Sequence, residues 1–364
     1  MTDQMLKNRP IASGGESVLA GRPPASWHMP PEWVKHSRCW MAYPSAHMGW
    51  AEDLADLRRT IASLAWAIRR FEPVCVVVCA VDEQAARSDL GPSIDLLVID
   101  VDDLWMRDTG PTFLVKAGGG AGEANLAGSV WGFNAWGEKF PGHVADRSLA
   151  QRLLTALDVT AYPAPIITEG GALHVDGEGT LLVTETSVLN DNRNPGLTKT
   201  EAEEIFRHWL GVTQVIWLPG SRIETVTDGH IDGFACFTRP GQVLAELPGS
   251  DTAGDATEMK ENLRALRLAR DAKGRSLEIG LLYRPAEIAS ATDRFCDCYI
   301  NFYIANGGVV MPRFNVPAAD QAAAAMVAKA FPDRTVIQVD IAAIAEGGGG
   351  IHCSTQQQPA PQEK

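Results

Sequence analysis

The stretch Val215-Ile216-Trp217-Leu218 and the segment Asp228-Gly229-His230-Ile231-Asp232 that follows it display the unit from which this chain is built. An apolar run of strand length ends, and a polar, glycine-bearing segment comes after it. The same succession occurs five times along the chain. The five units pair residues 96–100 with 105–110, 165–167 with 169–171, 215–218 with 228–232, 280–283 with 299–301, and 336–339 with 347–353.

One polar residue marks each unit, and these markers recur at similar intervals. Asp108, Glu169, His230, Asn301 and Cys353 are separated by 61, 61, 71 and 52 residues. Repeats of this length are typical of a propeller or a similar radial array, in which every unit offers residues to a shared centre. Chance recurrence in a strand-rich chain is the alternative. No linker interrupts the series, which favours a single domain.

Helices and strands are interleaved throughout, which indicates an α/β or mixed fold. Apolar residues at helical spacing predict amphipathic helices over residues 51–71, 145–157, 198–210 and 318–331. Short β-rich runs predict strands over residues 74–79, 96–101, 113–115, 181–184, 215–218, 233–237, 277–283, 300–304, 309–312 and 335–339.

Composition and charge narrow the function. The chain has 364 residues, 45% of them hydrophobic, and a net charge of −13. This balance argues against a general affinity for nucleic acid or for an anionic membrane, both of which require basic patches. It is compatible with a small cationic substrate. Seven cysteines leave at least one unpaired, so a reducing cytoplasm is the expected location.

The first residues differ in composition from the rest of the chain. Residues 1–24 are polar and rich in Gly, Ser and Pro, without the apolar centre of a signal peptide. No stretch reaches the ~18 consecutive apolar residues of a membrane-spanning helix. We expect a mobile N-terminal tail over residues 1–26, one domain over 27–358 and a C-terminal tail over 359–364.

Cys353 is the best candidate for a nucleophile. It follows Gly347-Gly348-Gly349-Gly350-Ile351-His352, and a glycine run lets another group approach the backbone closely. The run lacks the Lys-Ser/Thr of a phosphate loop. A buried, inert thiol is the alternative, and it is the interpretation for the other six cysteines. Among these, Cys296 and Cys298 have no second ligand pair nearby to form a zinc site.

His230 and Asp232 form a second candidate pair. In an extended segment, residues two apart share a face, so both side chains would point the same way. A metal site is a weaker alternative, because this spacing offers two ligands at most. A solvated polar turn is the plainest one.

Two further carboxylates, Asp108 and Glu169, gain meaning in combination with Asp232. A guanidinium ion is planar, always protonated and rich in N–H donors, so its pocket needs forked carboxylates and an apolar wall. Trp105 or Trp136 could supply the wall. The central carbon is a poor electrophile, which favours a thiolate nucleophile over water.

These residues stand in blocks that resemble the agmatine deiminases, part of the bacterial peptidyl-arginine deiminase-like group of guanidine-modifying enzymes. The match extends from about residue 27 to 358. The matching blocks are Trp27-His28-Met29-Pro30-Pro31-Glu32-Trp33, Trp40-Met41-Ala42-Tyr43-Pro44, Trp105-Met106-Arg107-Asp108-Thr109-Gly110-Pro111, Phe133-Asn134-Ala135-Trp136-Gly137, Glu169-Gly170-Gly171, Asn192-Arg193-Asn194-Pro195, Asp228-Gly229-His230-Ile231-Asp232, Tyr299-Ile300-Asn301-Phe302-Tyr303 and Gly349-Gly350-Ile351-His352-Cys353.

The resemblance implies a fold and a reaction. The fold is a five-bladed pseudo-symmetric α/β propeller, the pentein fold. The reaction is hydrolysis of agmatine to N-carbamoylputrescine and ammonia, a step in making putrescine, without metal or organic cofactor. The implied catalytic residues are the nucleophile Cys353, the proton carrier His230, the guanidinium clamp Asp108 and Asp232, and the orienting carboxylate Glu169. The implied substrate contacts are Trp105, Trp136, Asp228, Asn301 and Gly350, and a homo-oligomer is possible.

Some positions depart from the family pattern. Gly233 and Gly350 stand where Asn is usual, residues 221–226 and 33–40 differ in composition, and the segment after Gly137 is short. Arginine, a peptide-terminal arginine or another ω-guanidino compound therefore remain alternative substrates. An amidinotransferase is the nearest rival enzyme, and a non-catalytic binding propeller is a rival of another class. A papain-like peptidase is disfavoured, because there the Cys precedes the His.

The charges around Cys353 permit one electrostatic prediction. Nearby carboxylates should raise the pKa of its thiol in the absence of substrate, and an arriving cation should then help the thiol to ionise.

Overall fold

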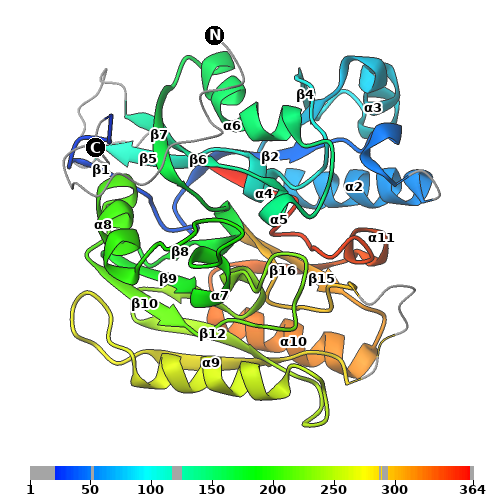
Figure 1. Ribbon diagram of the computed structural model, residues 1–364. Coiled ribbons are helices and arrows are strands. Elements are labelled where there is room, and N and C mark those ends of the chain that lie inside the picture. Colours follow the sequence, from blue (N-terminus) through cyan, green and yellow to red (C-terminus); the bar gives the residue numbers. More distant parts are fainter. Residues whose placement is uncertain (1–20, 51–52, 117–124, 287, 289–293, 361–364) are drawn as a thin grey trace.

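The computed structural model describes residues 21–50, 53–116, 125–286, 288 and 294–360. Within these residues the strands form five sheets that share one pattern. A first strand runs antiparallel to a second, and a third strand runs parallel to the second. Figure 1 shows the sheets grouped around a common centre, which confirms the five-bladed propeller of α/β class.

The blades follow the chain in order. The first contains β1 (Trp27–His28), β5 (Thr112–Lys116), β6 (Leu126–Gly132) and β7 (Thr160–Ile167). The second contains β8 (His174–Val175), β9 (Thr180–Thr184) and β10 (Gln214–Leu218). The third contains β11 (Ala235–Arg239), β12 (Gln242–Leu247) and β13 (Glu278–Tyr283). The fourth contains β14 (Tyr303–Ala305), β15 (Gly308–Arg313) and β16 (Thr335–Asp340).

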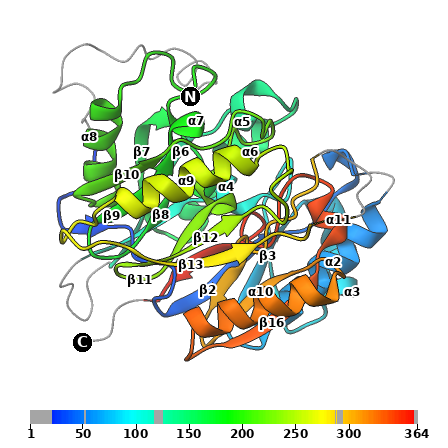
Figure 2. The same cartoon turned by 90° about the horizontal axis from the view of Figure 1, so that it is seen from below.

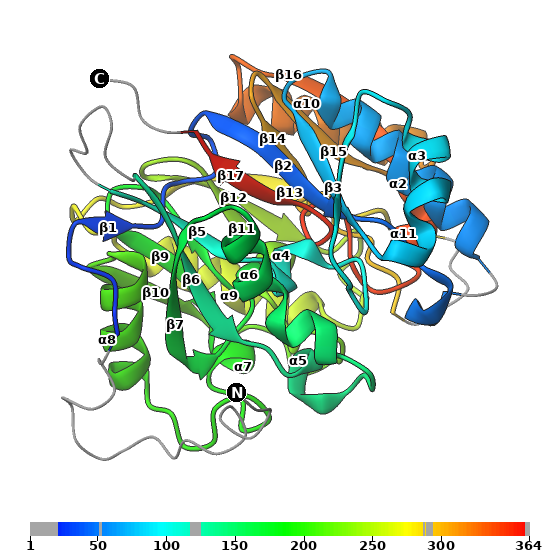
Figure 3. The same cartoon turned by 90° about the horizontal axis from the view of Figure 1, so that it is seen from above.

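The fifth blade closes the ring with strands from both ends of the domain. It contains β17 (Gln356–Pro359), β2 (His36–Ala42), β3 (Val74–Val78) and β4 (Asp95–Val98). Gln356 of β17 pairs with Trp40 of β2 in antiparallel register, and the red and blue strands lie side by side in Figure 3. This pairing places the segment after Cys353 next to the first strands of the chain.

A helix connects the second and third strands of each blade, because parallel neighbours require a crossover. These helices are α6 (Val144–Ala156), α8 (Lys199–Leu210), α9 (Ala256–Leu268), α10 (Pro317–Ala330) and α2 (Leu54–Arg69). They lie toward the outside of the sheets (Figures 1 and 2). A shorter helix, α3 (Glu83–Leu90), accompanies the fifth blade.

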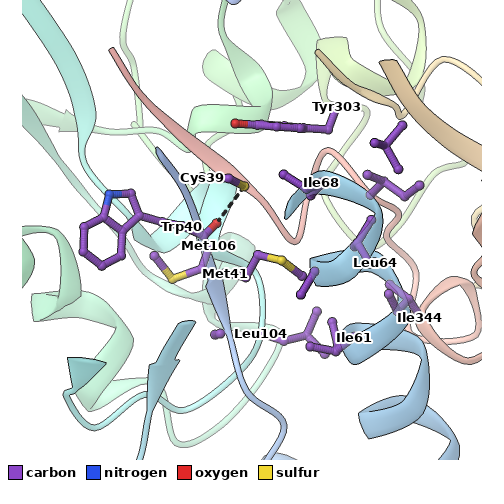
Figure 4. Packing of buried hydrophobic residues seen from close by; sticks show 14 of the residues in the cluster. Cys39, Trp40, Met41, Ile61, Leu64, Ile68, Leu104, Met106, Tyr303 and Ile344 are labelled. Carbon is purple, nitrogen blue, oxygen red and sulfur yellow. Dashed lines mark hydrogen bonds between the residues drawn. The ribbon is translucent and has the colours of Figure 1, made fainter. Parts of the chain in front are cut away.

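The apolar stripes of the helices build the core against the sheets. In α2, residues Ile61, Leu64 and Ile68 are fully buried, and Met41 of β2 extends toward them in the same apolar cluster (Figure 4). Helix boundaries follow local signals, as in α8, where Thr198 and Glu201 form a capping box.

The fold explains why five separate segments reach one place. Each predicted polar segment occupies the connection between the last strand of one blade and the antiparallel hairpin of the next. Asp108 lies between β4 and β5, Glu169 between β7 and β8, and His230 between β10 and β11. Asn301 lies between β13 and β14, and Cys353 between β16 and β17. Because the blades are arranged radially, each of these segments lies at the centre of the propeller.

Several predicted elements need correction. The strand expected over residues 300–304 is β14, which begins only at Tyr303, and the one expected over 233–237 is β11, which begins at Ala235. Strands β1, β2, β6, β8, β12 and β17 and helices α3 and α9 were missed, and of β7 only residues 165–167 were expected as an apolar run of strand length. β7 carries Pro163 and Pro165 and exposes several side chains, so it lacks the alternation of a half-buried strand.

The domain boundaries expected at residues 26 and 358 stay predictions. The first described strand begins at Trp27, and β17 extends to Pro359. Residues 1–20 and 361–364, which make up most of the two expected tails, lie outside the described residues. No helix within the described part of the chain has the length and apolarity to cross a bilayer.

Candidate active site

The thiol of Cys353 lies beside an amide and a carboxylate from two other blade connections. Its Sγ is 3.1 Å from Asn301 Nδ2, which donates to it, and 3.4 Å from Asp232 Oδ2. The backbone is fixed as well, because the Arg107 amide donates to the Cys353 carbonyl at 3.0 Å.

The glycine run before Cys353 permits the close approach that its sequence predicts. A side-chain carbon on Gly349 would lie 2.4 Å from the ring of Trp105, and one on Gly350 would lie 2.5 Å from Asn301 Oδ1. Neither distance is compatible with a side chain. Gly350 therefore contacts Asn301 and does not line either of the two cavities described below.

Asp232 joins the thiol to two imidazoles. Its Oδ2 accepts from Asn301 Nδ2 at 3.3 Å and lies 3.0 Å from His352 Nδ1. Burial raises the pKa of this carboxyl, but His352 and His230 outweigh burial and hold the pKa below its ordinary value. The segment is not extended as expected, because residues Ile231–Gly233 form a single 3-10 turn.

His230 is buried between carboxylates. Its Nε2 lies 3.1 Å from Glu169 Oε2, and its Nδ1 lies 3.8 Å from Asp108 Oδ2. Burial lowers the pKa of the imidazole, but Asp108 and Glu169 outweigh burial and raise the pKa to about 9. The ring is therefore protonated at neutral pH.

Glu169 is held in place by a cation that sequence reasoning left without a role. Arg193 Nε donates to Glu169 Oε1 at 2.8 Å, and Arg193 Nη1 pairs with Asp228 Oδ2 at 2.5 Å. Burial raises the pKa of Glu169, but Arg193 and His230 outweigh burial and hold the pKa below its ordinary value. The carboxylate is therefore ionised. Asp228, which also pairs with Lys139, is absent from the described linings of both cavities and acts on Arg193 instead.

Asp108 differs from Glu169, because burial raises its pKa and no arginine or lysine contacts it among the described ion pairs. It accepts from Trp136 Nε1 at 2.9 Å and from the Gly171 amide at 2.8 Å. A side-chain carbon on Gly171 would lie 2.7 Å from His230 Nδ1, 2.9 Å from Asp108 Oδ1 and 3.0 Å from Asp232 Oδ2. The three predicted groups therefore converge around this glycine.

A cavity of about 520 Å³ opens onto Cys353 and Asp108. Its described walls include three indole rings, those of Trp50, Trp105 and Trp136. The lining also includes the acidic Asp53, Asp103 and Glu346, while Arg294 is the one basic residue among the described residues that line it. The cavity is thus aromatic and acidic, which suits an organic cation.

A second cavity, of about 380 Å³, reaches Cys353 from the side of His230, Asp232 and Asn301. Gly233 lines it, and a side-chain carbon there would meet only Cys298 Sγ, at 4.0 Å. Of the two glycines that replace a usual Asn, Gly233 thus has room for a side chain, whereas Gly350 does not.

The pKa of the Cys353 thiol lies well above its ordinary value, in the direction expected from the sequence. Burial is the largest cause, and Asp232, Cys296 and Asp108 add to it. The expected contribution of nearby carboxylates is therefore present, and burial, which the sequence did not indicate, is larger. The other half-buried cysteine, Cys296, lines the second cavity, while Cys39, Cys75, Cys79, Cys236 and Cys298 are buried.

Sequence reasoning assigned no role to several buried residues around the site. Glu32, Arg107, His352 and Arg193 occur inside the matching blocks, but their partners are distant in sequence. His352 and Glu32 are 320 residues apart and lie within 2.8 Å. The pairing of such residues needs the closed ring. Among the described residues, no group of three or more His, Cys, Asp or Glu side chains is arranged to hold a metal ion.

Comparison with solved structures places this fold in a known class. A dimethylarginine dimethylaminohydrolase aligns with a TM-score of 0.50 at 12% identity, which shows a shared pentein fold alone. An agmatine deiminase of Enterococcus faecalis aligns with a TM-score of 0.88 at 30% identity, covering 93% of this chain and 98% of that chain.

Sequence comparison gives the family. The family model of the Porphyromonas-type peptidyl-arginine deiminases matches residues 28–359, and the chain belongs to this family. The agmatine deiminase of Stutzerimonas stutzeri is 39% identical, with 92% of this chain and 96% of the relative covered. That of Pseudomonas fluorescens is 38% identical, with 95% of this chain and 99% of the relative covered.

Proposed function

We propose that the chain is an agmatine deiminase, which hydrolyses agmatine to N-carbamoylputrescine and ammonia, with Cys353 as nucleophile and His230 as acid and base. The observation that carries this proposal is the convergence of a thiol, an imidazole and two carboxylates where an aromatic, acidic cavity and a second cavity both reach Cys353. Relatives that share at least 38% of their residues over more than nine-tenths of the chain are named agmatine deiminases, which supports the same reaction.

Asp108 and Asp232 bind the guanidinium group from two sides. Each is a buried carboxylate, and a planar guanidinium offers N–H donors to both. The arriving cation also offsets the surplus of negative charge that these carboxylates create. Trp105 and Trp136 provide flat apolar walls against the substrate.

Charge at the site connects binding with ionisation of the nucleophile. The pKa of Cys353 is raised without substrate, so the thiol is protonated at rest. A guanidinium next to Asp108 and Asp232 reverses the local charge and lowers the thiol pKa. The thiolate therefore forms mainly when substrate is present, which protects it from other electrophiles.

The first chemical step forms a covalent intermediate. The Cys353 thiolate attacks the guanidinium carbon and forms a C–S bond. His230, protonated at neutral pH, gives its proton to the departing nitrogen, and the C–N bond breaks to release ammonia. An S-alkylthiouronium remains on Cys353.

The second step returns the enzyme to its resting state. His230 has now lost its proton and takes one from a water molecule, whose oxygen attacks the thiouronium carbon. The C–S bond breaks, the oxygen gives up its second proton as the carbonyl of the carbamoyl group forms, and the departing thiolate takes up a proton to restore the resting thiol. Glu169, fixed by Arg193, orients His230 throughout. This route requires neither metal nor organic cofactor.

The acidic residues that line the first cavity favour agmatine over arginine. Agmatine carries a second cation at its other end, and Asp103 and Glu346 lie among the residues that line the cavity. Arginine carries a carboxylate there, which these acidic groups would repel. We expect the reaction to supply putrescine synthesis in the reducing cytoplasm. Assembly into a homo-oligomer also stays a prediction.

Ammonia release with agmatine, arginine and a peptide-terminal arginine tests the proposal. We expect kcat/KM for agmatine to exceed that for the other two by at least about a hundredfold, the effect of unfavourable charge at a buried site. A preference for arginine or the peptide would contradict the substrate assignment. Product formed only when an amine acceptor is added would identify an amidinotransferase, and binding without turnover of any substrate would identify a non-catalytic protein.

A further inference from the structure

A second histidine lies beside the nucleophile, and the proposed reaction does not use it. His352 directly precedes Cys353, is buried and fills the space between two carboxylates. Its Nδ1 lies 3.0 Å from Asp232 Oδ2, and its Nε2 lies 2.8 Å from Glu32 Oε1. Both ring nitrogens therefore face an acidic oxygen.

These contacts require a doubly protonated ring. A neutral imidazole has one N–H and one lone pair, so one contact would set a lone pair against a carboxylate oxygen. An imidazolium donates charge-assisted hydrogen bonds to both oxygens. Consistent with this geometry, the pKa of His352 is raised: burial and Arg107 lower it, but Glu32 and Asp232 outweigh them.

The surrounding charges balance only if His352 is a cation. The titratable and charged groups that face its ring are Glu32, Asp232, Arg107 and His174. Arg107 Nη1 lies 3.4 Å from Glu32 Oε1, and Arg107 Nε donates to the His352 carbonyl. The ring of His174 stacks on that of His352 at 6.5 Å, and burial lowers its pKa to about 4, which leaves it neutral. Two cations then match the two buried carboxylates.

Glu32, Arg107, His174 and His352 are named the sealed cluster below. All four side chains are almost completely excluded from solvent. None of them is among the described residues that line the two cavities at Cys353. The side-chain contact that joins the cluster to the reactive groups is therefore the one between His352 and Asp232.

We propose that His352 is a positioning residue that acts through Asp232, an inference that rests on the function proposed above. Fixed on Glu32, the imidazolium keeps Asp232 ionised and holds its Oδ2 at 3.4 Å from Cys353 Sγ. Asp232 thereby remains a hydrogen-bond acceptor for the guanidinium over the working pH range. The glutamate on the far side of the histidine makes this arrangement permanent, since it leaves no ring nitrogen without a proton.

The substitution His352→Gln separates this role from a structural one. Glutamine can donate one hydrogen bond but carries no charge, so burial would raise the pKa of Asp232. We expect the acid limb of the pH profile of kcat/KM to move to higher pH by about one unit or more, and kcat/KM near pH 6 to fall roughly tenfold. The fall in kcat/KM should come mainly from a higher KM, because Asp232 binds the guanidinium.

His174→Gln is the matched control. His174 is a buried imidazole of the same cluster, but the described hydrogen bonds and ion pairs include no contact between it and Asp232. Its removal should lower thermal stability without moving the acid limb. An unmoved limb in folded His352→Gln, or an equal shift in His174→Gln, would overturn the inference.

A titration of the histidine rings decides the protonation state independently of turnover. With ¹⁵N-labelled histidine, NMR should show His352 as imidazolium at about pH 8, well above the ordinary pKa. The substitution Glu32→Gln should lower the pKa of His352, so that its ring titrates at lower pH. The signal is assigned by its loss in His352→Gln or, if that variant does not fold, by its perturbation in Cys353→Ala. A neutral His352 at pH 7 would overturn the inference, whereas failure of the wild type to release ammonia would overturn the proposed function alone.

Discussion

Two buried polar regions meet at Asp232, and they balance their charges differently. On one side lies the reactive pocket, formed by Cys353, His230, Asp108 and Glu169; on the other lies the sealed cluster. In the sealed cluster every carboxylate contact is matched by a cation. In the reactive pocket the pKa of Asp108 is raised by burial, and that of the thiol is raised as well.

This difference indicates which region awaits a ligand. Buried carboxylates without a full complement of cations are costly, and a protein retains them where a cationic ligand completes the balance. The sealed cluster is complete without a ligand and fixes the geometry of Asp232. Substitutions should therefore separate the two regions, with the larger losses of activity in the first and the larger losses of stability in the second.

The largest effect is expected for Cys353→Ala. Removal of the nucleophile should lower ammonia release by at least about 10⁴-fold, because no other group can form the thiouronium. Agmatine binding, measured by calorimetry in this variant, should persist because both aspartates remain. Cys75→Ala, in the buried strand β3, is the control and should change stability alone. Residual turnover above one-hundredth of the wild type would exclude Cys353 as the nucleophile.

Glu32→Gln should be the most damaging to the fold. It removes the carboxylate shared by His352 and Arg107 and leaves two buried cations with one acceptor fewer. Breaking such a pair costs roughly 3–5 kcal/mol of unfolding free energy. Denaturant unfolding measures this loss. A loss below about 1 kcal/mol, the range of surface ion pairs, would show that the sealed cluster is not a unit.

Asp108→Asn should have the opposite profile. It removes half of the guanidinium clamp, so kcat/KM should fall by roughly 10²-fold or more. Stability should stay the same or rise, because burial already disfavours the charged form of Asp108. Steady-state kinetics and denaturant unfolding, measured on the same preparation, test both halves. Loss of stability without loss of activity would reverse the assignment of the two regions.

The smallest effect concerns the pH dependence of stability. The folded pKa of His230 is about 9, above its unfolded value, so its contribution is complete below about pH 6.5 and is lost as pH rises through about 9. The difference in unfolding free energy between the wild type and His230→Gln should shrink by roughly 3 kcal/mol across this window. A difference that grows with pH would contradict the raised pKa.

The fold could be predicted from the sequence because each repeat has a local sequence pattern. In each repeat the sequence alone shows an apolar strand followed by a polar, glycine-bearing connection, and five such repeats predict five blades. The strands that were not predicted are those in which tertiary packing overrides the local sequence pattern. β7 contains prolines, and β6 contains Gly128 and Gly132, which pack against Leu154 and Ile167.

The candidate site was predictable where a residue follows its own strand or glycine run, as with Cys353 and Asp108. The sealed cluster was not, because its contacts join residues from opposite ends of the chain. Glu32 meets His352 only after β17 has paired with β2 and closed the ring. The His230 and Asp232 pair was predicted with the wrong local structure, since a 3-10 turn, and not an extended segment, brings the two together.

Mass spectrometry of the acid-quenched reaction with agmatine tests the central claim most directly. The peptide that contains Cys353 should gain the mass of agmatine less that of ammonia, and the gain should disappear in Cys353→Ala. Continued turnover with an unmodified Cys353 at every quench time, or an adduct on another residue, would contradict covalent catalysis by this thiol.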